Sequence, residues 1–207
     1  MNKILVAAFL FLSTFCFGQG TDINKTPLKG DWIATAYFGN ATLKAEDKFK
    51  VNANIAGGFL GKEFLLNNRY SIITGITNMH VRANFYNIDL GQVFVTNNSL
   101  QIPLTFHFNG SVLEKTSYYI GAGIYGSFLY SSTFENEVQD REVEEKKLGF
   151  NFGLLGDVGI RHQFNDIFNL NIGMRTFGDQ LSAYKGDKQE FKLTNVYLFE
   201  IGAGFDF

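Results

Sequence analysis

Five charged residues in the second half of the chain could form a network of ion pairs. Asp157 and Arg161 lie four positions apart, which places them on one face of an extended strand. Arg175, Glu200 and Asp206 lie on the small, polar side of two later segments. Charges that face a confined interior must pair, because an unpaired buried charge is costly. If these residues face the interior of the fold, the network has two interpretations. It either fills that interior with salt bridges, or its ion pairs exchange partners and open a narrow gated pore.

The three histidines do not indicate catalysis or metal binding. His80, His107 and His162 lie on separate segments, and no group of His, Asp and Glu has the spacing of metal ligands. A lipid-modifying outer-membrane enzyme would need a serine within hydrogen-bond reach of its base. No histidine lies at the same position along the neighbouring strands as Ser127 or Ser131. We therefore expect no catalytic residue, no metal and no cofactor, and we rank the lipid-modifying enzyme as a less favoured alternative.

The elements that position these residues show an alternation of period two and no sustained helical period. In residues 148–164 (LGFNFGLLGDVGIRHQF) nearly all even positions are apolar, and the odd positions are mostly small or polar. The same split occurs in residues 100–108, 118–130, 168–177 and 197–207, and more weakly in 30–41, 50–65 and 69–83. Such alternation is typical of β-strands. The sequence therefore predicts eight strands.

The connections between these strands indicate how they are arranged. The gaps lie near 42–48, 66–68, 84–99, 109–116, 131–147, 165–167 and 178–190, and longer ones alternate with shorter ones. Alternating short turns and long loops are typical of a barrel inserted from one side of a membrane. We expect an all-β fold, an eight-stranded antiparallel up-and-down transmembrane β-barrel with periplasmic termini.

Two of the longer gaps have alternative interpretations. Residues 84–99 contain β-prone side chains, so they either extend the strands above the membrane or cover a partner. Residues 131–147 form the most charged stretch of the chain. They are a solvated loop, a contact to lipopolysaccharide through divalent cations, or a docking site for a surface partner.

The two faces of the strands differ in size as well as polarity. The chain has 23 Phe and 22 Gly, and Phe gathers on the apolar face while Gly gathers on the polar one. The interior of an eight-stranded barrel has room only for side chains. Small residues inside and large ones outside predict lipid around the barrel and a side-chain-filled interior. A soluble lipocalin-like binder would have the opposite arrangement.

The N-terminal residues resemble a secretory signal. A short start with Lys3 is followed by an apolar core at 4–12 and small residues near Gly18. We expect a signal peptide at 1–18 that is cleaved after Gly18, a periplasmic lead-in at 19–29, and the barrel domain at 30–207. Lipidation at Cys16 is the alternative. The net charge of −2 argues against a nucleic-acid partner.

The C-terminus resembles the assembly signal of bacterial outer-membrane proteins. The last segment, YLFEIGAGFDF, alternates up to a final phenylalanine. The resemblance implies recognition by the barrel assembly machinery. The residues of this signal would be Tyr197, Phe199, Ile201, Phe205 and Phe207.

Several strands are also similar to those of the PorT-like outer-membrane β-barrel family of Bacteroidetes. LQIPLTFHF (100–108) resembles its hydrophobic-x-Ile-Pro-Leu strand, and YYIGAGIYGSFLYSS (118–132) resembles its Gly-rich fifth strand. FNFGLLGDVGIRHQF and FNLNIGMRTFGDQL continue the likeness, which covers roughly residues 30–207. The resemblance implies a Gram-negative outer membrane, lipid and lipopolysaccharide as surroundings, and no catalytic residues. It also implies a structural or interaction role, with a secretion or surface protein as partner.

Overall fold

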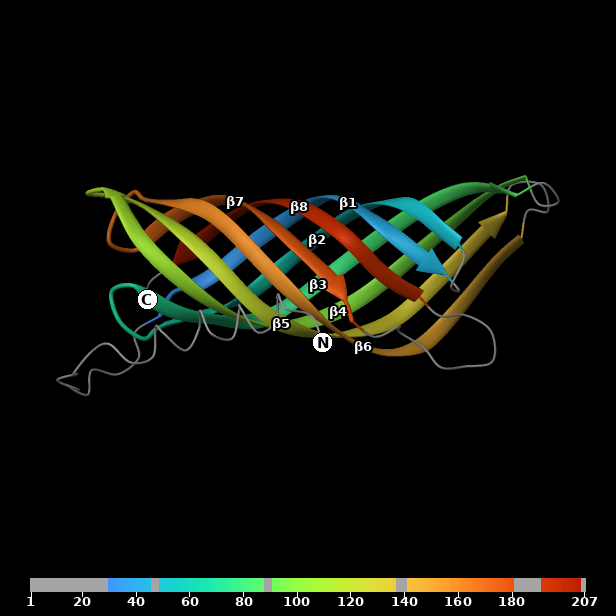
Figure 1. The fold of residues 1–207 in the computed structure, drawn as a ribbon, viewed down its shortest axis with the longest axis horizontal. Helices are drawn as coiled ribbons and strands as arrows, with labels where there is room; N and C mark the ends of the chain where they lie inside the picture. The colour runs from blue at the N-terminus through green and yellow to red at the C-terminus, as the bar shows by residue number, and fades with distance from the viewer. Residues whose placement is uncertain (1–29, 46–48, 88–90, 137–140, 181–190, 206–207) are drawn as a thin grey trace, which may run out of the picture.

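The computed structural model describes residues 30–45, 49–87, 91–136, 141–180 and 191–205, which form eight antiparallel strands in a closed ring (Figure 1). Each strand pairs with its neighbours in sequence, and β8 returns to pair with β1, where Trp32 lies opposite Phe205. The predicted up-and-down barrel is confirmed. The strands are β1 (Trp32–Ala45), β2 (Phe49–Leu65), β3 (Tyr70–Asn87), β4 (Gly91–Leu113), β5 (Thr116–Asn136), β6 (Arg141–Gln163), β7 (Phe168–Asp179) and β8 (Phe191–Phe205).

The two ends of the barrel differ. At one end, here called the turn end, β1 begins, β8 ends and short turns join β2–β3, β4–β5 and β6–β7. Asn67 and Asn165 organise two of these turns, because each side-chain carbonyl accepts hydrogen bonds from the backbone N–H groups two and three residues later, at 2.8–3.0 Å. The opposite end, here called the loop end, carries the other connections. The expected signal peptide and lead-in lie outside the described residues.

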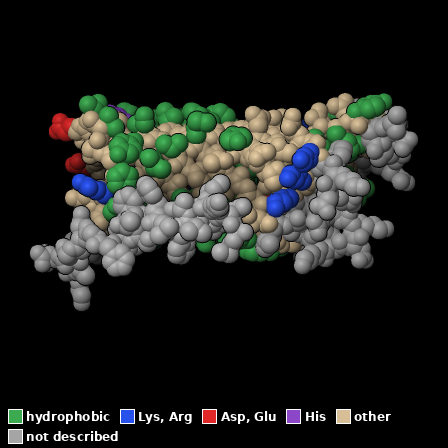
Figure 2. Space-filling view, viewed as in Figure 1, with side chains coloured by type: hydrophobic (Ala, Val, Ile, Leu, Met, Phe, Trp, Pro, Cys, Tyr) green, Lys and Arg blue, Asp and Glu red, His purple; other side chains and the backbone are tan. Residues whose placement is uncertain are grey.

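The outer surface carries a continuous band of large apolar side chains near the turn end. Ile102, Ile124 and Leu154 lie on this surface at adjacent strands and are 42–60% exposed. This band is called the apolar belt, and its other members include Phe38, Leu60, Ile76, Leu100, Leu104, Phe128, Val158, Ile172, Met174, Phe199 and Ile201. Figure 2 shows hydrophobic side chains spread over this part of the barrel. The predicted assignment of the faces holds here, because the apolar side of each strand points outward.

Three predicted gaps are strand in the structure. β3 continues to Asn87 and β4 starts at Gly91, so most of 84–99 extends the strands. Likewise, β5 runs to Asn136 and β6 starts at Arg141, which leaves little of 131–147 as a connection. β4 also reaches Leu113, directly before the turn to β5. The prediction of loops at these places was wrong, and of the two interpretations offered for 84–99, strand extension is correct.

In the half of the barrel near the loop end, the apolar side chains lie on the inner face of the strands. In β4, Leu100 and Ile102 point outward, whereas Val93 and Val95, at the other parity, are buried inside. β3 changes in the same way between Ile76 and Met79. This half therefore has an apolar core, formed by Ala41, Leu43, Ala53, Ile55, Met79, Val81, Ala83, Val93, Val95, Leu129, Leu155, Phe177, Val196 and Leu198. A polar interior along the whole barrel is therefore not found.

Strands β3 to β6 reach further than the others and form a four-stranded extension at the loop end (Figure 1). This extension, residues 78–87, 91–98, 130–136 and 141–148, is called the outer sheet. Its outward face carries polar groups among the described side chains: His80 Nδ1 lies 2.8 Å from Asn98 Oδ1, and Arg82 lies over the ring of Phe94. Polar outside and apolar inside is the pattern of a protein surface in water.

No helix in the described part of the chain is long and apolar enough to cross a membrane.

The position of the apolar belt can be tested by placing one charge inside it and one beyond it. Ile102→Arg puts a charge in the belt, and we expect a loss of about 2–4 kcal/mol in unfolding free energy, the typical cost of a charge at a bilayer midplane. Gln92→Arg, on the same strand and outward face but in the outer sheet, serves as the control and should cost under about 1 kcal/mol. Urea unfolding in phospholipid vesicles measures both, and equal losses would contradict the assignment.

Candidate functional site in the barrel interior

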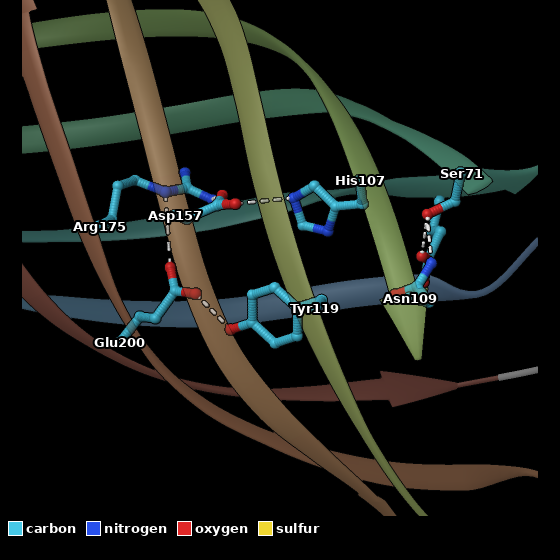
Figure 3. A network of polar contacts seen from close by, with 8 residues as sticks. Ser71, His107, Asn109, Tyr119, Asp157, Arg175 and Glu200 are labelled. Carbon is cyan, nitrogen blue, oxygen red and sulfur yellow. Dashed lines mark hydrogen bonds and ion pairs between the residues drawn. The ribbon is translucent and has the colours of Figure 1, made fainter. Parts of the chain in front are cut away.

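The middle of the interior holds a cluster of buried polar groups from five neighbouring strands. Arg175 lies between two carboxylates: its Nη2 is 2.9 Å from Asp157 Oδ2 and its Nε is 3.4 Å from Glu200 Oε2. On the far side of Asp157, Oδ1 lies 3.0 Å from His107 Nε2. Tyr119 donates its hydroxyl hydrogen to Glu200 at 2.5 Å. These five residues, called the charge cluster, point toward one another across the barrel (Figure 3).

A glycine makes this cluster possible. His107 on β4 and Asp157 on β6 are separated by β5, where Gly121 is opposite both of them in the register. A Cβ atom at Gly121 would overlap the Asp157 carboxylate and the His107 ring. The missing side chain therefore lets the two groups meet over the intervening strand. The His107 ring also stacks on Tyr119, with ring centroids 5.2 Å apart.

A second pair of charges lies closer to the turn end. Arg161 Nη1 is 2.8 Å from Glu63 Oε2, and the Glu63 side chain is 1% exposed. Ser71 donates to Glu63 at 2.5 Å and accepts from Asn109 Nδ2 at 3.1 Å. Above this pair the barrel opens into a cavity of about 340 Å³, lined by residues of the β4–β5 and β6–β7 turns, by neighbouring strand ends and by Arg161. The interior is thus open at the turn end and filled behind it.

Beyond the charge cluster, toward the loop end, the interior is filled by packed side chains. Tyr125 is 1% exposed and donates its hydroxyl hydrogen to Asp179. The second oxygen of Asp179 accepts from the backbone N–H of Leu193 at 2.7 Å. The Tyr125 ring packs edge-on against Phe177, with centroids 5.3 Å apart. The apolar core follows directly, with a small cavity of about 30 Å³ beside it.

The structure divides the five residues of the predicted charge network. Asp157, Arg175 and Glu200 lie together in the charge cluster, whereas Arg161 pairs with Glu63 in the second pair. Asp206 lies outside the described residues. Sequence reasoning missed Glu63 as a partner and did not connect His107 or Tyr119 to the carboxylates. The parity of Glu63 places it on the inner side of its strand, which is the signal that could have identified it.

The residues of the predicted C-terminal signal lie on β8. Tyr197, Phe199 and Ile201 are on the outer surface with exposures of 40–61%. Phe205 pairs with both Trp32 and Phe168, and Phe207 lies outside the described residues. These positions leave the signal as a prediction, because assembly itself is not visible in the fold.

The polar contacts of the three histidines reach Asn98, Asp157 and Thr116, and none of these pairs includes a serine. Among the described residues, no group of three or more His, Cys, Asp and Glu could hold a metal ion. The arrangement is suited to joining β4 through β8 by charge pairs and to closing the interior.

The role of Gly121 can be tested by adding one methyl group. Gly121→Ala forces the new Cβ against Asp157 and His107, and we expect it to destabilise the barrel by about 1–3 kcal/mol, as over-packed interiors do. Gly178→Ala is the control, because a Cβ there meets no atom within 4 Å. Urea unfolding in vesicles compares the two variants. A Gly121→Ala protein as stable as the control would show that His107 and Asp157 need no contact.

Comparison with solved structures shows the same fold in small outer-membrane barrels. Neisserial surface protein A matches with a TM-score of 0.52 at 10% identity, covering 86% of this chain and 97% of the other. A major outer membrane protein from Thermus thermophilus matches with a TM-score of 0.52 at 12% identity, covering 86% and 99%. The attachment invasion locus protein Ail of Yersinia pestis is 15% identical, with a TM-score of 0.47 over 86% and 99% of the chains. No curated protein matches the chain in sequence.

The family comparison gives the same result at the level of sequence. The outer membrane protein beta-barrel domain matches residues 31–178, which is more than half of the chain and includes β1 to β7 almost entirely. The match contains four residues of the charge cluster and the second pair of charges. The structure adds β8, which closes the ring behind the matched residues. The chain therefore belongs to the family of the outer membrane protein beta-barrel domain.

Proposed function

We propose that this outer-membrane barrel is non-enzymatic, does not conduct, and serves as a structural and interaction platform at the cell surface. The observation that carries the proposal is the filled interior. The charge cluster, Tyr125 and the apolar core follow one another along the barrel axis, so no described passage joins the two ends. Because the described residues form neither a passage nor a catalytic group, we infer that the barrel acts through its surface.

The outer sheet is the part of that surface best suited to binding a protein. In the described part of the chain, β6 pairs with β7 only from Gly153 onward, and the last contact across this edge is the hydrogen bond from Gln180 N to Phe152 O. Residues 141–151 of β6 therefore pair with β5 alone among the described strands. An edge of this length can accept an extended segment of a partner as an added strand.

The resemblance to PorT-like barrels supports a narrower form of the proposal, in which the partner is a component of a PorT-like secretion system. In this arrangement the termini lie in the periplasm, the loop end faces outward, and the outer sheet meets the partner beyond the lipid. Cleavage of the signal peptide after Gly18 and recognition of the C-terminal signal by the assembly machinery precede this state.

A narrow gated pore is the second candidate, and one observation favours it. Arg175 contacts two carboxylates, Asp157 and Glu200, so it could move toward either of them. Tyr119 would remain bonded to Glu200, and His107 would remain beside Asp157. The cavity at the turn end would form the entrance of such a pore. A lipid-modifying enzyme and a soluble lipocalin-like binder have weaker support, since the serine–histidine pair is missing among the described residues and the belt is apolar outside.

Conductance in planar bilayers separates the platform from the pore. We expect the wild-type protein to give no single-channel steps above the protein-free bilayer, because its interior is filled. Arg175→Gln, which leaves two buried carboxylates without their cation, should destabilise the barrel by about 3–5 kcal/mol. Wild-type steps whose size or frequency changes in Arg175→Gln would favour the gated pore.

Docking at the edge of β6 that pairs with no described strand can be tested with proline at two successive positions. Neighbouring residues of an antiparallel strand direct their N–H groups to opposite edges, so one of Glu142→Pro and Val143→Pro breaks the ladder to β5 and the other removes only an edge donor. The edge variant is the one whose folded band on SDS gels is lost at the same temperature as the folded band of the wild type. We expect it to lose co-isolation of the secretion partner at least tenfold, and full retention of the partner would contradict docking at this edge.

A further inference from the structure

Three lysines lie side by side on the outer surface near the loop end. In the register of the barrel, Lys44 on β1 is directly opposite Lys50 on β2 and directly opposite Lys192 on β8. These three residues are called the lysine row. Figure 2 shows a row of basic side chains across this region of the barrel.

The strand alternation places the lysine row on the outward face. Leu43, next to Lys44, is buried inside, and its partners Val51 and Leu193 pack against the apolar core. The lysines at the alternate positions therefore face outward, and Lys50 is exposed. The Lys192 ammonium donates to the carbonyl oxygen of Gln180 at 3.2 Å.

Three cations in this arrangement repel one another. Directly opposite residues of antiparallel strands have Cβ atoms roughly 5 Å apart, and like charges in such pairs destabilise a sheet. None of the ion pairs between described residues includes a member of the row. By contrast, the outward cation on β3, Arg82, has Glu135 at 4.0 Å. Asp179, at the end of β7, is buried and bound to Tyr125 and the Leu193 N–H group, and its carboxylate also interacts electrostatically with Lys192.

The height of the row above the apolar belt fits the headgroup region of a membrane. On β1 the outward positions run from Phe38 in the belt through Asn40 and Thr42 to Lys44. Six residues span about 20 Å along a strand, or about 14 Å in height at a tilt of about 45°. A lysine side chain can reach several ångströms back toward the lipid. The row therefore lies above the hydrocarbon, within reach of lipid headgroups.

We propose that the lysine row is a binding site for the phosphate groups of a phosphorylated lipid in the outer leaflet, of the lipid A type. Phosphates supply anions for three cations that form no ion pair with another described residue, and lysine binds phosphate as a point charge. The acyl chains of the same lipid would lie against the belt near Phe38 and Phe199, whose rings pack 5.1 Å apart. The site uses the outward orientation of the loop end given under Proposed function, and it is independent of any protein partner.

Binding and stability measurements on the full mature chain in a zwitterionic detergent test the site. The probes are bisphosphorylated lipid A, lipid A without its phosphates, and inorganic phosphate. We expect Lys44→Gln to weaken binding of bisphosphorylated lipid A about fivefold, and the variant with Lys44, Lys50 and Lys192 all changed to Gln about a hundredfold, at about 1 kcal/mol per lysine near a charged surface. Native mass spectrometry gives the dissociation constants.

The difference in unfolding temperature between Lys44→Gln and the wild type should have opposite signs without and with lipid. Without lipid, Lys44→Gln should be as stable as the wild type or more stable, because the repulsion in the row is relieved. With bisphosphorylated lipid A, the wild type should be the more stable of the two. A variant that is less stable without lipid would show that the lysines serve the fold and would overturn the site.

Arg82→Gln is the matched control, since it removes one outward cation in the same half of the barrel. We expect it to bind lipid A as the wild type does. Equal weakening by Arg82→Gln would show general charge attraction instead of a site. If the phosphate-free lipid binds as tightly as bisphosphorylated lipid A, the row does not recognise phosphate. If millimolar inorganic phosphate raises the unfolding temperature as much as bisphosphorylated lipid A does, the row binds a free anion and not a lipid.

Discussion

Closure of the backbone ladder between β8 and β1 is the constraint on which the rest of the structure depends. In hydrocarbon every N–H and C=O group must be bonded within the protein, so a sheet can cross a membrane only as a ring without edges. Closure with Trp32 opposite Phe205 fixes the total shear of the ring, to which the registers of the eight strand pairs must add up. This register decides which side chains meet inside. It brings His107, Gly121, Asp157 and Arg175 into one row across β4 to β7, and the charge cluster follows from this row.

Strand number, strand direction and the lipid-facing side of the membrane part could all be predicted from the sequence, because they depend only on local alternation. The contacts of the charge cluster could not, because they depend on register. Nothing near Asp157 in the sequence indicates that Gly121 opposes it and leaves room for His107. The failure at 84–99 has another cause. Val93 and Val95 alternate as regularly as Leu100 and Ile102 do, but at the opposite parity, so the apolar side changes within one strand. This change is the passage of one strand from lipid into water.

The two halves of the barrel are therefore organised in opposite ways on one continuous sheet. Near the turn end the interior holds charge pairs and the exterior is apolar. Near the loop end the interior is an apolar core and the exterior is polar. The asymmetry among strands adds a third region, since β3 to β6 continue beyond β1, β2, β7 and β8. The outer sheet and the lysine row thus lie on different strands. The proposed protein contact and the proposed lipid contact can therefore be separated by mutation.

The change of parity along the strands also fixes the depth at which the protein sits in its bilayer. If the barrel moved toward its loop end, Leu100 and its neighbours would enter water, and if it moved toward its turn end, Asn40 and Thr42 would enter hydrocarbon. Either displacement costs free energy on several strands at once. A membrane whose hydrocarbon thickness differs from the height of the belt must therefore adapt to the protein, by thinning or thickening around it. The barrel imposes a hydrophobic mismatch on its surroundings, and this makes it a local determinant of outer-membrane thickness.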